Sequence, residues 1–517
     1  MKKYLVILLL ILLLGLALRV YPAIKSPGMF NEPDVYIYYS VAQQTLANHM
    51  HITSKLSGVP PVPYSEFPGL VLVPAYLSKY TGIPLSLIFE YLPVLMGLLG
   101  IIVVYLLMDD FMHQHWVSNL AAFIYAVIPA AIYRGMAGEW RGGVFVVVFV
   151  GIVLLFLIKT TKKTAIWTIP GAILFTIISV WFWSGGVYIL AILAIYLASA
   201  LIFYLLPRFS RAVSNDPGLK NKLTYLLIFI LLPIGFLIMI HIGYFKNLLS
   251  GYFNFKTSYI DELAPTSLSF IFWYYNWVFV AAIMGIALMI ILDSKSYFHK
   301  SQFALFSLFV PTLIMASIEV RWLSLFAIPA SIYAAYLVYA LLTIFKVPKH
   351  TSYLIIGFLC ILLLLISIYF ILPLVPSDDI NPQFISALEW MRNNTPANST
   401  VLTLWPDGSL VEGVAQRESY TDSIMSLGSP ESLGIEKMLY EPAGNYSYLY
   451  HLDPSYLLVR KYWLNETDGI LLQMGLPLNT SYNGTNMQQL LQINNTSPPP
   501  FKIVYQNNGT IIYKIKN

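Results

Sequence analysis

The chain has 517 residues, of which 58% are hydrophobic, 15% aromatic and only 11% charged. A soluble domain usually has roughly 25% charged residues, so this composition excludes a wholly soluble protein and indicates an integral membrane protein. The net charge of +5 is small for this length. Basic residues of a membrane protein usually mark cytoplasmic loops, so we expect no nucleic-acid partner. The single cysteine, Cys360, excludes an internal disulfide and a cysteine-cluster metal site.

Apolar runs long enough for membrane helices recur up to residue 376. A spanning helix needs about 20 apolar residues, and on that basis we predict about 11 to 13 spans. The shorter run at 66–80 could be a half-helix. The first run could be a cleaved signal peptide, but it is long, ends at Arg19 and lacks a small-residue cleavage signal, so we expect a retained anchor. The predicted runs are 4–21, 84–108, 116–134, 143–158, 164–181, 185–206, 223–243, 270–292, 302–318, 322–345 and 352–376.

Basic residues fall in the connections that place the N-terminus in the cytoplasm, beginning with Lys2 and Lys3. By the positive-inside rule, residues 22–83, 135–142, 244–269 and the tail from 377 then lie outside. All N-x-S/T sequons start after residue 390, and sequons accept glycans only on an exported surface, although an Asn- and Thr-rich tail can also form them by chance. We therefore expect a multi-pass protein of the cell membrane with an extracytoplasmic C-terminal part.

The tail resembles a soluble α/β domain. Asn381 followed by Pro382 is typical of a helix N-cap and first helical position. The stretch STVLTLW alternates as a strand does, and FKIVYQNNGTIIYKIKN predicts a hairpin around Asn508-Gly509. We predict a transmembrane domain over 1–376 and an extracytoplasmic α/β domain over 377–517.

Two outer segments near the N-terminal half have acids that could do chemistry. Glu32 and Asp34 lie in FNEPD, where carboxylates at a membrane surface could bind a hard divalent cation such as Mg²⁺ or Mn²⁺. A solvated loop is the alternative. Glu139 and Arg141 lie in AGEWRGG, whose glycines would allow close approach of a ligand. An ordinary tight turn is the alternative there.

Two further segments carry charged candidates. Asp261 and Glu262 are adjacent in SYIDELAP, and in a helix they would diverge by about 100°, so at most one enters a common site. Arg321 lies near the end of an apolar run, where an arginine must snorkel or meet a partner. A guanidinium suits bidentate binding of phosphate oxygens, and pairing with Glu319 or a lipid headgroup is the alternative.

These segments, in this order, resemble the catalytic subunit of oligosaccharyltransferases, particularly the archaeal single-subunit type. LRVYPAIKSPGMFNEPDVYIYY is similar to the family's first outer loop, IYRGMAGEWRGGVF to its second acidic motif, and SYIDELAP to its TIxE or SVxE motif. VRWLSLFAIPASIYAAY is similar to the segment with a phosphate-binding arginine, FISALEWMRNNTPANSTVLTLWPDG to the start of the soluble domain, and FKIVYQNNGTIIYKI to its final hairpin. The resemblance implies the GT-C fold, an α-helical polytopic membrane protein with a C-terminal extracytoplasmic α/β domain.

The resemblance also implies an activity, protein N-glycosylation by a single-subunit glycosyltransferase. Such an enzyme moves a glycan from a polyprenyl (dolichyl) phosphate or diphosphate lipid to the Asn of an N-x-S/T sequon in an acceptor protein, with inversion at the anomeric carbon. Asp34, Glu139 and Glu262 would hold one divalent ion, Mn²⁺ or Mg²⁺. Asp34 and Glu262 would also act on the acceptor amide, and Arg321 would bind the donor phosphate, which makes Asp34, Glu262 and Arg321 the implied catalytic residues.

The acceptor would be recognised by LWPDG, which stands in the place of the family's WWDYG motif. The resemblance assigns Trp405, Asp407 and Gly408 to a pocket for the Ser or Thr hydroxyl of the sequon. A site that hydrogen-bonds a hydroxyl rejects acceptors without one. The acid has moved by one position, to Asp407, so the acceptor rule stays open.

The second acidic motif departs further from the family's pattern. The family offers an acid at the positions that Arg141 and Gly143 occupy here, so Glu139 would have to replace it. Two alternative functions remain open. One is a GT-C glycosyltransferase that uses a lipid-phosphate sugar on another acceptor, and the other is a degenerate, non-catalytic paralogue that binds glycolipid. A transporter would be expected to have acids inside its spans, where they are almost absent.

Overall fold

The computed structural model describes most of the chain. It does not describe residues 1, 53–55, 57–63, 65–66, 161–163, 188, 191, 193–266, 293–299, 319, 372–379, 424–429, 465–482, 484, 492–500 and 516–517. Glu262, the run at 223–243 and most of the predicted outer loop 244–269 therefore lie outside the described residues.

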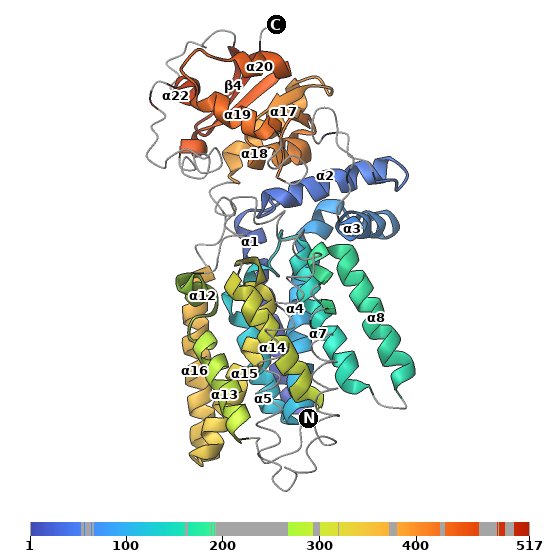
Figure 1. The fold of residues 1–517 in the computed structure, drawn as a ribbon, viewed down its shortest axis with the longest axis vertical. Coiled ribbons are helices and arrows are strands. Elements are labelled where there is room, and N and C mark those ends of the chain that lie inside the picture. The colour runs from blue at the N-terminus through green and yellow to red at the C-terminus, as the bar shows by residue number, and fades with distance from the viewer. Residues whose placement is uncertain are drawn as a thin grey trace, which may run out of the picture. The chain divides into compact units, whose positions relative to one another are not determined.

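The chain divides into two compact units (Figure 1). The helical unit comprises Met1–Tyr21, Pro93–Met136 and Gly142–Leu374. The α/β unit comprises Pro22–Leu92, Ala137–Arg141 and Val375–Asn517. Two segments predicted as loops of the transmembrane domain thus belong to the same compact unit as the C-terminal tail, while the predicted boundary at residue 377 stays a prediction.

The helical unit is built from long apolar helices. Within the described residues, five helices are long and apolar enough to cross a membrane, or six if one bent pair is counted as a span. Its elements are α1 (Lys2–Lys25, as far as Tyr21), α4 (Leu85–Met112, from Pro93), α5 (His115–Val127), α6 (Pro129–Tyr133), α7 (Gly142–Lys159), α8 (Ala165–Phe182), η1 (Ser184–Val187), α12 (Leu268–Tyr275), α13 (Trp277–Leu292), α14 (Lys300–Ile318), η4 (Val320–Trp322), α15 (Leu323–Ile344) and α16 (Lys349–Ile371).

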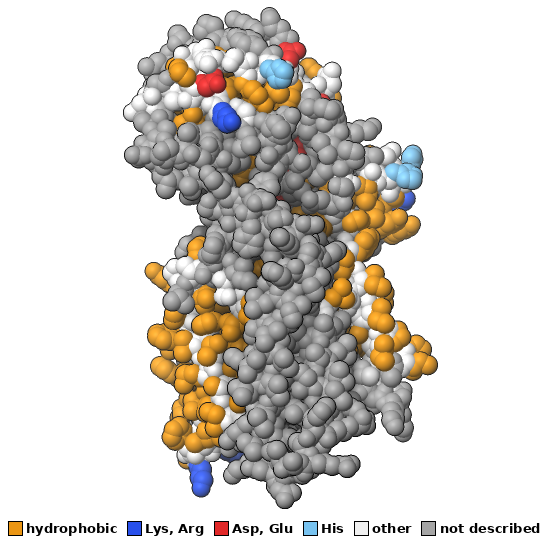
Figure 2. Space-filling model, in the orientation of Figure 1, with side chains coloured by type: hydrophobic (Ala, Val, Ile, Leu, Met, Phe, Trp, Pro, Cys, Tyr) orange, Lys and Arg blue, Asp and Glu red, His pale blue; other side chains and the backbone are white. Residues whose placement is uncertain are grey.

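Helix α15 is at the centre of this unit. It is buried along most of its length and packs against α5, α7, α13 and α14, of which α13 and α14 run beside it in Figure 1. Helix α16 is the opposite case, because its apolar side chains are exposed: Tyr353 by 65%, Phe358 by 66% and Tyr369 by 74%. Hydrophobic side chains also cover much of the visible described surface of this unit (Figure 2). Such a surface suits lipid, so the protein is a multi-pass membrane protein.

Two predicted runs are each split into two helices. The run at 270–292 bends by 88° between α12 and α13, and Asn276, at the junction, has a positive φ of 53°. The run at 116–134 breaks between α5 and α6, where Ile128 is extended before Pro129. Proline disfavours the helical conformation of the residue before it and supplies no backbone N–H, which accounts for the break at Ile128.

A buried arginine satisfies the backbone that the second break exposes. Arg19 of α1 is fully buried and donates to the carbonyls of Gly15 at 3.2 Å, Ala126 at 3.0 Å and Ala131 at 3.3 Å. A Cβ at Gly97 would lie 2.5 Å from Nε of Arg19, so glycine is required there. Carbonyls without partners in an apolar interior are costly, and Arg19 therefore stabilises the α5–α6 break.

The α/β unit contains one mixed sheet of order β2-β1-β3-β5-β4. Strand β1 pairs in parallel with β2 and β3, while β3, β5 and β4 are antiparallel. Its elements are α2 (Pro33–Ala47), α3 (Pro68–Thr81), α17 (Pro382–Asn394), β1 (Thr400–Leu402), α18 (Trp405–Leu410), η6 (Val411–Ala415), β2 (Glu418–Ser419), α19 (Pro430–Tyr440), α20 (Ser447–Leu452), β3 (Tyr456–Arg460), η7 (Lys461–Leu464), α22 (Asn486–Leu491), β4 (Phe501–Gln506) and β5 (Thr510–Ile515).

Local signals in the tail are confirmed. Asn381 caps α17 by accepting a hydrogen bond from the N–H of Phe384 at 2.9 Å, with Pro382 at the first helical position. Strands β4 and β5 form the predicted hairpin, and the Asn507 side chain accepts from the N–H groups of Gly509 and Thr510 in its turn.

The LWPDG segment is held by a buried ion pair. Asp407 in α18 accepts from Arg460 at 2.6 Å and from the indole N–H of Trp463 at 2.7 Å. Both partners of the Asp407–Arg460 pair are almost fully buried, and the guanidinium lies 3.9 Å from the centre of the Phe384 ring. The pair thus ties α18 to β3 and α17.

Asp407→Asn should lower the thermal stability of the purified protein. The substitution leaves the Arg460 charge buried without its counter-charge, which costs about 3–5 kcal/mol. Asp453→Asn is the matched control, because Asp453 is exposed and has a left-handed backbone that asparagine tolerates. Equal melting temperatures for the two variants would contradict a stabilising role of the buried pair.

Candidate functional site

Glu32 and Asp34 lie at the beginning of α2. Glu32 is the N-cap residue with extended backbone, Pro33 is the first helical residue, and Asp34 is in the first turn. The partial positive charge of a helix N-terminus favours carboxylates there. Proline at this position preorganises the helix start. The FNEPD sequence therefore sets the positions of both acids, at the N-cap and in the first turn of α2.

Arg141 bridges these two carboxylates. One guanidinium nitrogen, Nη2, lies 3.0 Å from Oε2 of Glu32 and 3.0 Å from Oδ2 of Asp34. Nε of the same arginine lies 3.9 Å from Oε1 of Glu139. The Arg141 side chain is 13% exposed and that of Glu139 fully buried. Two of the acids predicted to hold an ion, Asp34 and Glu139, thus lie beside this guanidinium together with Glu32.

The backbone around Gly138 brings the second motif to the first. Gly138 has φ of 78°, its N–H donates to the carbonyl of Glu90 at 2.9 Å, and its own carbonyl accepts from the N–H of Asn31 at 3.3 Å. The side chain of Asn31 also donates to the carbonyl of Ala137 at 2.6 Å. Residues 137–141 are therefore bonded to the segment just before Glu32.

Trp140 holds the segment 137–141 through contacts with Leu70 and Phe89. It is fully buried, donates its indole N–H to the carbonyl of Leu70 at 2.9 Å, and packs on Phe89 with ring centres 4.8 Å apart. The contacts of Gly138 and Trp140 therefore fix the backbone just before Arg141. Its contact with the acids of α2 is thus supported by packing as well as by charge.

The residues of this site do not fit a divalent ion in the arrangement described. An ion bound by Glu32 and Asp34 would lie about 2.0–2.6 Å from their oxygens, in the space that Nη2 of Arg141 occupies 3.0 Å from each. Among the described residues, no group of three or more His, Cys, Asp or Glu could hold a metal. Glu262 lies outside that part of the chain, and the predicted ion stays a prediction.

The LWPDG segment packs against α2 within the α/β unit. Helix α18 contacts α2, and the adjoining η6 contacts it as well. At Gly413 of η6 an added Cβ would lie 2.8 Å from Cβ of Tyr36, so the two backbones approach closely. Burial raises the pKa of the Tyr36 phenol above its ordinary value, and its oxygen accepts the N–H of Phe30 at 3.1 Å. Asp34 and LWPDG are thus parts of one packed body.

The three residues predicted to bind the acceptor differ in their surroundings. Trp405 is partly exposed at the start of α18. Asp407 is buried, with both oxygens bonded to Arg460 and Trp463. Gly408 is buried against the carbonyl of Thr421, where a Cβ would clash. Among the three, Trp405 is the partly accessible one, and the roles assigned to all three stay predictions.

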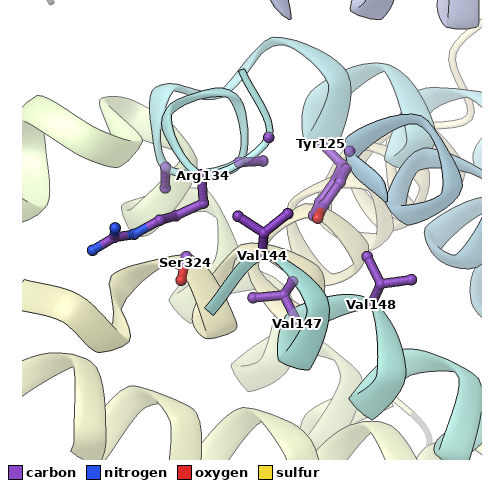
Figure 3. A pocket seen from close by; sticks show the side chains of 10 residues that line it. Tyr125, Arg134, Val144, Val147, Val148 and Ser324 are labelled. Carbon is purple, nitrogen blue, oxygen red and sulfur yellow. The ribbon is translucent and has the colours of Figure 1, made fainter. Parts of the chain in front are cut away.

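A cavity in the helical unit contains two arginines. Its volume is about 170 Å³, and Arg134 at the end of α6 and Arg321 of η4 both line it, together with Ala130, Tyr133, Phe270, Tyr274, Val320, Leu323 and Ser324. Figure 3 shows a second pocket, which shares Ala130, Arg134 and Ser324 with this cavity; there the Arg134 side chain extends past Ser324, away from Tyr125 and the valines of α7. The guanidinium also lies 5.2 Å from the centre of the Tyr133 ring.

Sequence reasoning singled out Arg321 but missed Arg134. The available signal was a charge inside IYRGMAGEW, at the end of the apolar run 116–134, where a buried arginine needs a partner or a ligand. Two cationic side chains around one cavity suit an anion with several oxygens, such as a phosphate.

Gly138→Ala should destabilise the site more than Gly28→Ala. Both glycines have positive φ, of 78° and 75°, so each alanine carries a left-handed strain of about 1–2 kcal/mol. A Cβ at Gly138 would also lie 3.1 Å from Cα of Phe30, whereas a Cβ at Gly28 has no neighbour within 4 Å. Crowding should add roughly 1–3 kcal/mol at Gly138. Thermal unfolding of the two variants checks the difference, and equal losses would contradict the close approach.

Comparison with protein-family models and with curated proteins found no match to this sequence. Solved structures do share its fold. AglB, the oligosaccharyltransferase from Archaeoglobus fulgidus, in complex with an inhibitory peptide and a dolichol-phosphate, has a TM-score of 0.71 and 17% identity over 92% of this chain and 71% of that one. The same enzyme tethered with an acceptor peptide containing the NVT sequon has a TM-score of 0.68 and 17% identity over 100% and 74%.

A further structure of that enzyme, in complex with Zn and sulfate, has a TM-score of 0.67 and 17% identity over 97% of this chain and 79% of that one. At this level of sequence identity, the structural likeness shows a shared fold. The expected fold class is confirmed: the chain has the GT-C fold, with a C-terminal sheet domain, of the archaeal oligosaccharyltransferases that its sequence motifs resemble.

Proposed function

We propose that this protein is a glycosyltransferase of the oligosaccharyltransferase type. It transfers a glycan from a polyprenyl (dolichyl) phosphate or diphosphate to the asparagine of an N-x-S/T sequon. The observation that carries the proposal is the packing of α18, with its LWPDG motif, on α2, with Asp34, in one unit. An acceptor held by that motif would have its asparagine within reach of an acid on the same body.

Asp34 is assigned to the acceptor amide. An amide nitrogen is a poor nucleophile, because its lone pair is delocalised into the carbonyl. A carboxylate that accepts a hydrogen bond from this N–H favours twisting of the amide and can take its proton as the C–N bond forms. Glu262, outside the described residues, is proposed as the second acid. Because nitrogen displaces the phosphate in a single step, the anomeric carbon is inverted.

The arginine cavity is assigned to the donor phosphate. As the bond between the anomeric carbon and the phosphate oxygen breaks, negative charge develops on the leaving group, and fixed cations stabilise it. Arg321 and Arg134 both line the cavity and can each present two N–H groups to phosphate oxygens. The dolichol-phosphate bound to a protein of the same fold supports this assignment.

Trp405 is assigned to the Ser or Thr of the sequon, because it is partly exposed beside α2. Asp407 is assigned a positioning role, because both of its oxygens are bonded within the unit. The peptide with an NVT sequon tethered to a protein of the same fold supports an acceptor of this kind. The proposal includes a single-subunit enzyme of the cell membrane with residues 377–517 outside, which the basic connections and the sequons support.

The resemblance also implies assistance by Mn²⁺ or Mg²⁺, and one structure of this fold was solved with Zn. In this chain the ion would have to displace Arg141 from Glu32 and Asp34.

Arg141 also favours a second candidate function, glycolipid binding without transfer. A protein that binds a glycolipid phosphate without transferring its glycan needs the arginine cavity but no metal-binding acid, and Arg141 occupies the position of such an acid. A GT-C enzyme with another acceptor would also keep the cavity. It would have no need of the contact between α18 and α2.

Asp34→Asn should reduce glycan transfer by roughly 100-fold or more, since a positioned base contributes about 10²–10⁴. The assay uses purified protein, a polyprenyl-linked glycan and a labelled peptide with an N-x-T sequon, with a Q-x-T peptide as acceptor control. Asp453→Asn, an exposed change of the same kind, should retain activity. Equal transfer by the wild type and Asp34→Asn would contradict the role of Asp34.

Arg321→Gln and Arg134→Gln should each weaken binding of polyprenyl phosphate by about 10-fold or more, because a charge-assisted hydrogen bond contributes about 1.5–3 kcal/mol. Binding is measured with the lipid phosphate in detergent micelles. Arg392→Gln, on the exposed surface of α17, is the matched control. Binding that depends on Arg321 without any transfer would support the glycolipid-binding candidate, and unchanged binding in both variants would contradict the phosphate site.

A further inference from the structure

The position of the Arg141 guanidinium between two carboxylates bears on metal binding at this site. Nη2 contacts one oxygen of Glu32 and one of Asp34 at the same distance, 3.0 Å. A single nitrogen between two carboxylate oxygens has the position that a bridging cation would have. The third acid, Glu139, faces Nε of the same side chain at 3.9 Å.

We propose that the guanidinium of Arg141 replaces the divalent cation at the Glu32–Asp34 site, so that this site binds no metal while Arg141 is present. Under the proposed function, on which this part of the inference rests, glycan transfer would then need no added divalent ion. Arg141 becomes a charge-balancing and positioning residue.

Packing supports a permanent rather than an occasional place for this guanidinium. The Arg141 side chain is only 13% exposed, and Glu139, two residues before it, is fully buried. Between them, Trp140 is buried and bonded to the carbonyl of Leu70. A swing of Arg141 towards solvent would break its contacts with Glu32 and Asp34. Breaking a partly buried pair of this kind is unfavourable.

The replacement changes the chemistry of the site in a defined way. A divalent ion accepts electron pairs, so it can polarise a phosphate oxygen or bind water. A guanidinium has only N–H donors and stays protonated. It can therefore neutralise Glu32 and Asp34 and hold the Asp34 carboxylate in one orientation, but it supplies no Lewis acid.

Binding of Mn²⁺ alone tests the replacement directly. Purified wild type, Arg141→Met and Arg141→Asp are stripped with a chelator, and binding is followed by the loss of the free-Mn²⁺ paramagnetic resonance signal. The wild type should show no saturable binding at this site. Arg141→Asp should bind Mn²⁺ saturably, roughly 100-fold or more tighter than any residual binding by the wild type, because a ligand replaces a cation. Arg141→Met, which removes the charge without adding a ligand, should lie between them.

A double variant locates the ion. Arg141→Asp with Asp34→Asn should lose the binding gained by Arg141→Asp alone. Saturable Mn²⁺ binding by the wild type that disappears in Asp34→Asn would overturn the proposal. Failure of Arg141→Asp to bind Mn²⁺, while its melting temperature equals that of the wild type, would overturn it as well.

The proposed activity is tested separately by measuring glycan transfer in the presence of chelator. Transfer that persists without divalent ions supports the replacement, and transfer that is lost on chelation and restored by Mn²⁺ contradicts it. If no variant transfers glycan under any condition, the proposed function fails. The Mn²⁺ titration still decides whether Arg141 stands in the place of an ion.

Discussion

The contact of Arg141 with Glu32 and Asp34 is the interaction on which the candidate site depends. It joins side chains that are 109 and 107 positions apart in the sequence. Three carboxylates this close together repel one another in a partly buried place, and some cation must hold them there. Here the cation is a side chain of the protein itself, the Arg141 guanidinium. The loop held by Gly138 and Trp140 places it next to Glu32 and Asp34.

The α/β unit explains how Asp34 and the LWPDG segment, which are far apart in the sequence, come together. Residues 22–92 and 137–141 belong to the same compact unit as the C-terminal part, and α18 and η6 pack on α2. The buried Asp407–Arg460 pair then holds α18 from its other side. A small change in either contact would move Trp405 relative to Asp34, so stability and site geometry are coupled in this unit.

The helical unit shows a different use of arginine. Arg19 has a structural role. It is buried, and its Nη1 and Nη2 donate to the carbonyls of Gly15 in α1 and of Ala126 and Ala131 beside the α5–α6 break. Arg134 and Arg321 line a cavity. In an apolar unit each guanidinium needs acceptors, and what distinguishes the second pair is that the space beside it is open to a ligand.

Hydropathy, helix capping and turn chemistry are local properties, and they predict the membrane class, the α/β tail, the Asn381 cap and the final hairpin from the residues alone. Motif order also pointed to the GT-C fold and to Asp34, Glu139 and Arg321. The contacts of Arg141 with the acids, the internal bonds of Asp407 and the place of Arg134 in the cavity of Arg321 became visible in the folded chain. The breaks at Ile128 and Asn276 likewise escaped a reading based on hydropathy. A charged side chain acts through its neighbours in space. Those neighbours depend on how distant segments pack together, and a local residue pattern does not specify that packing.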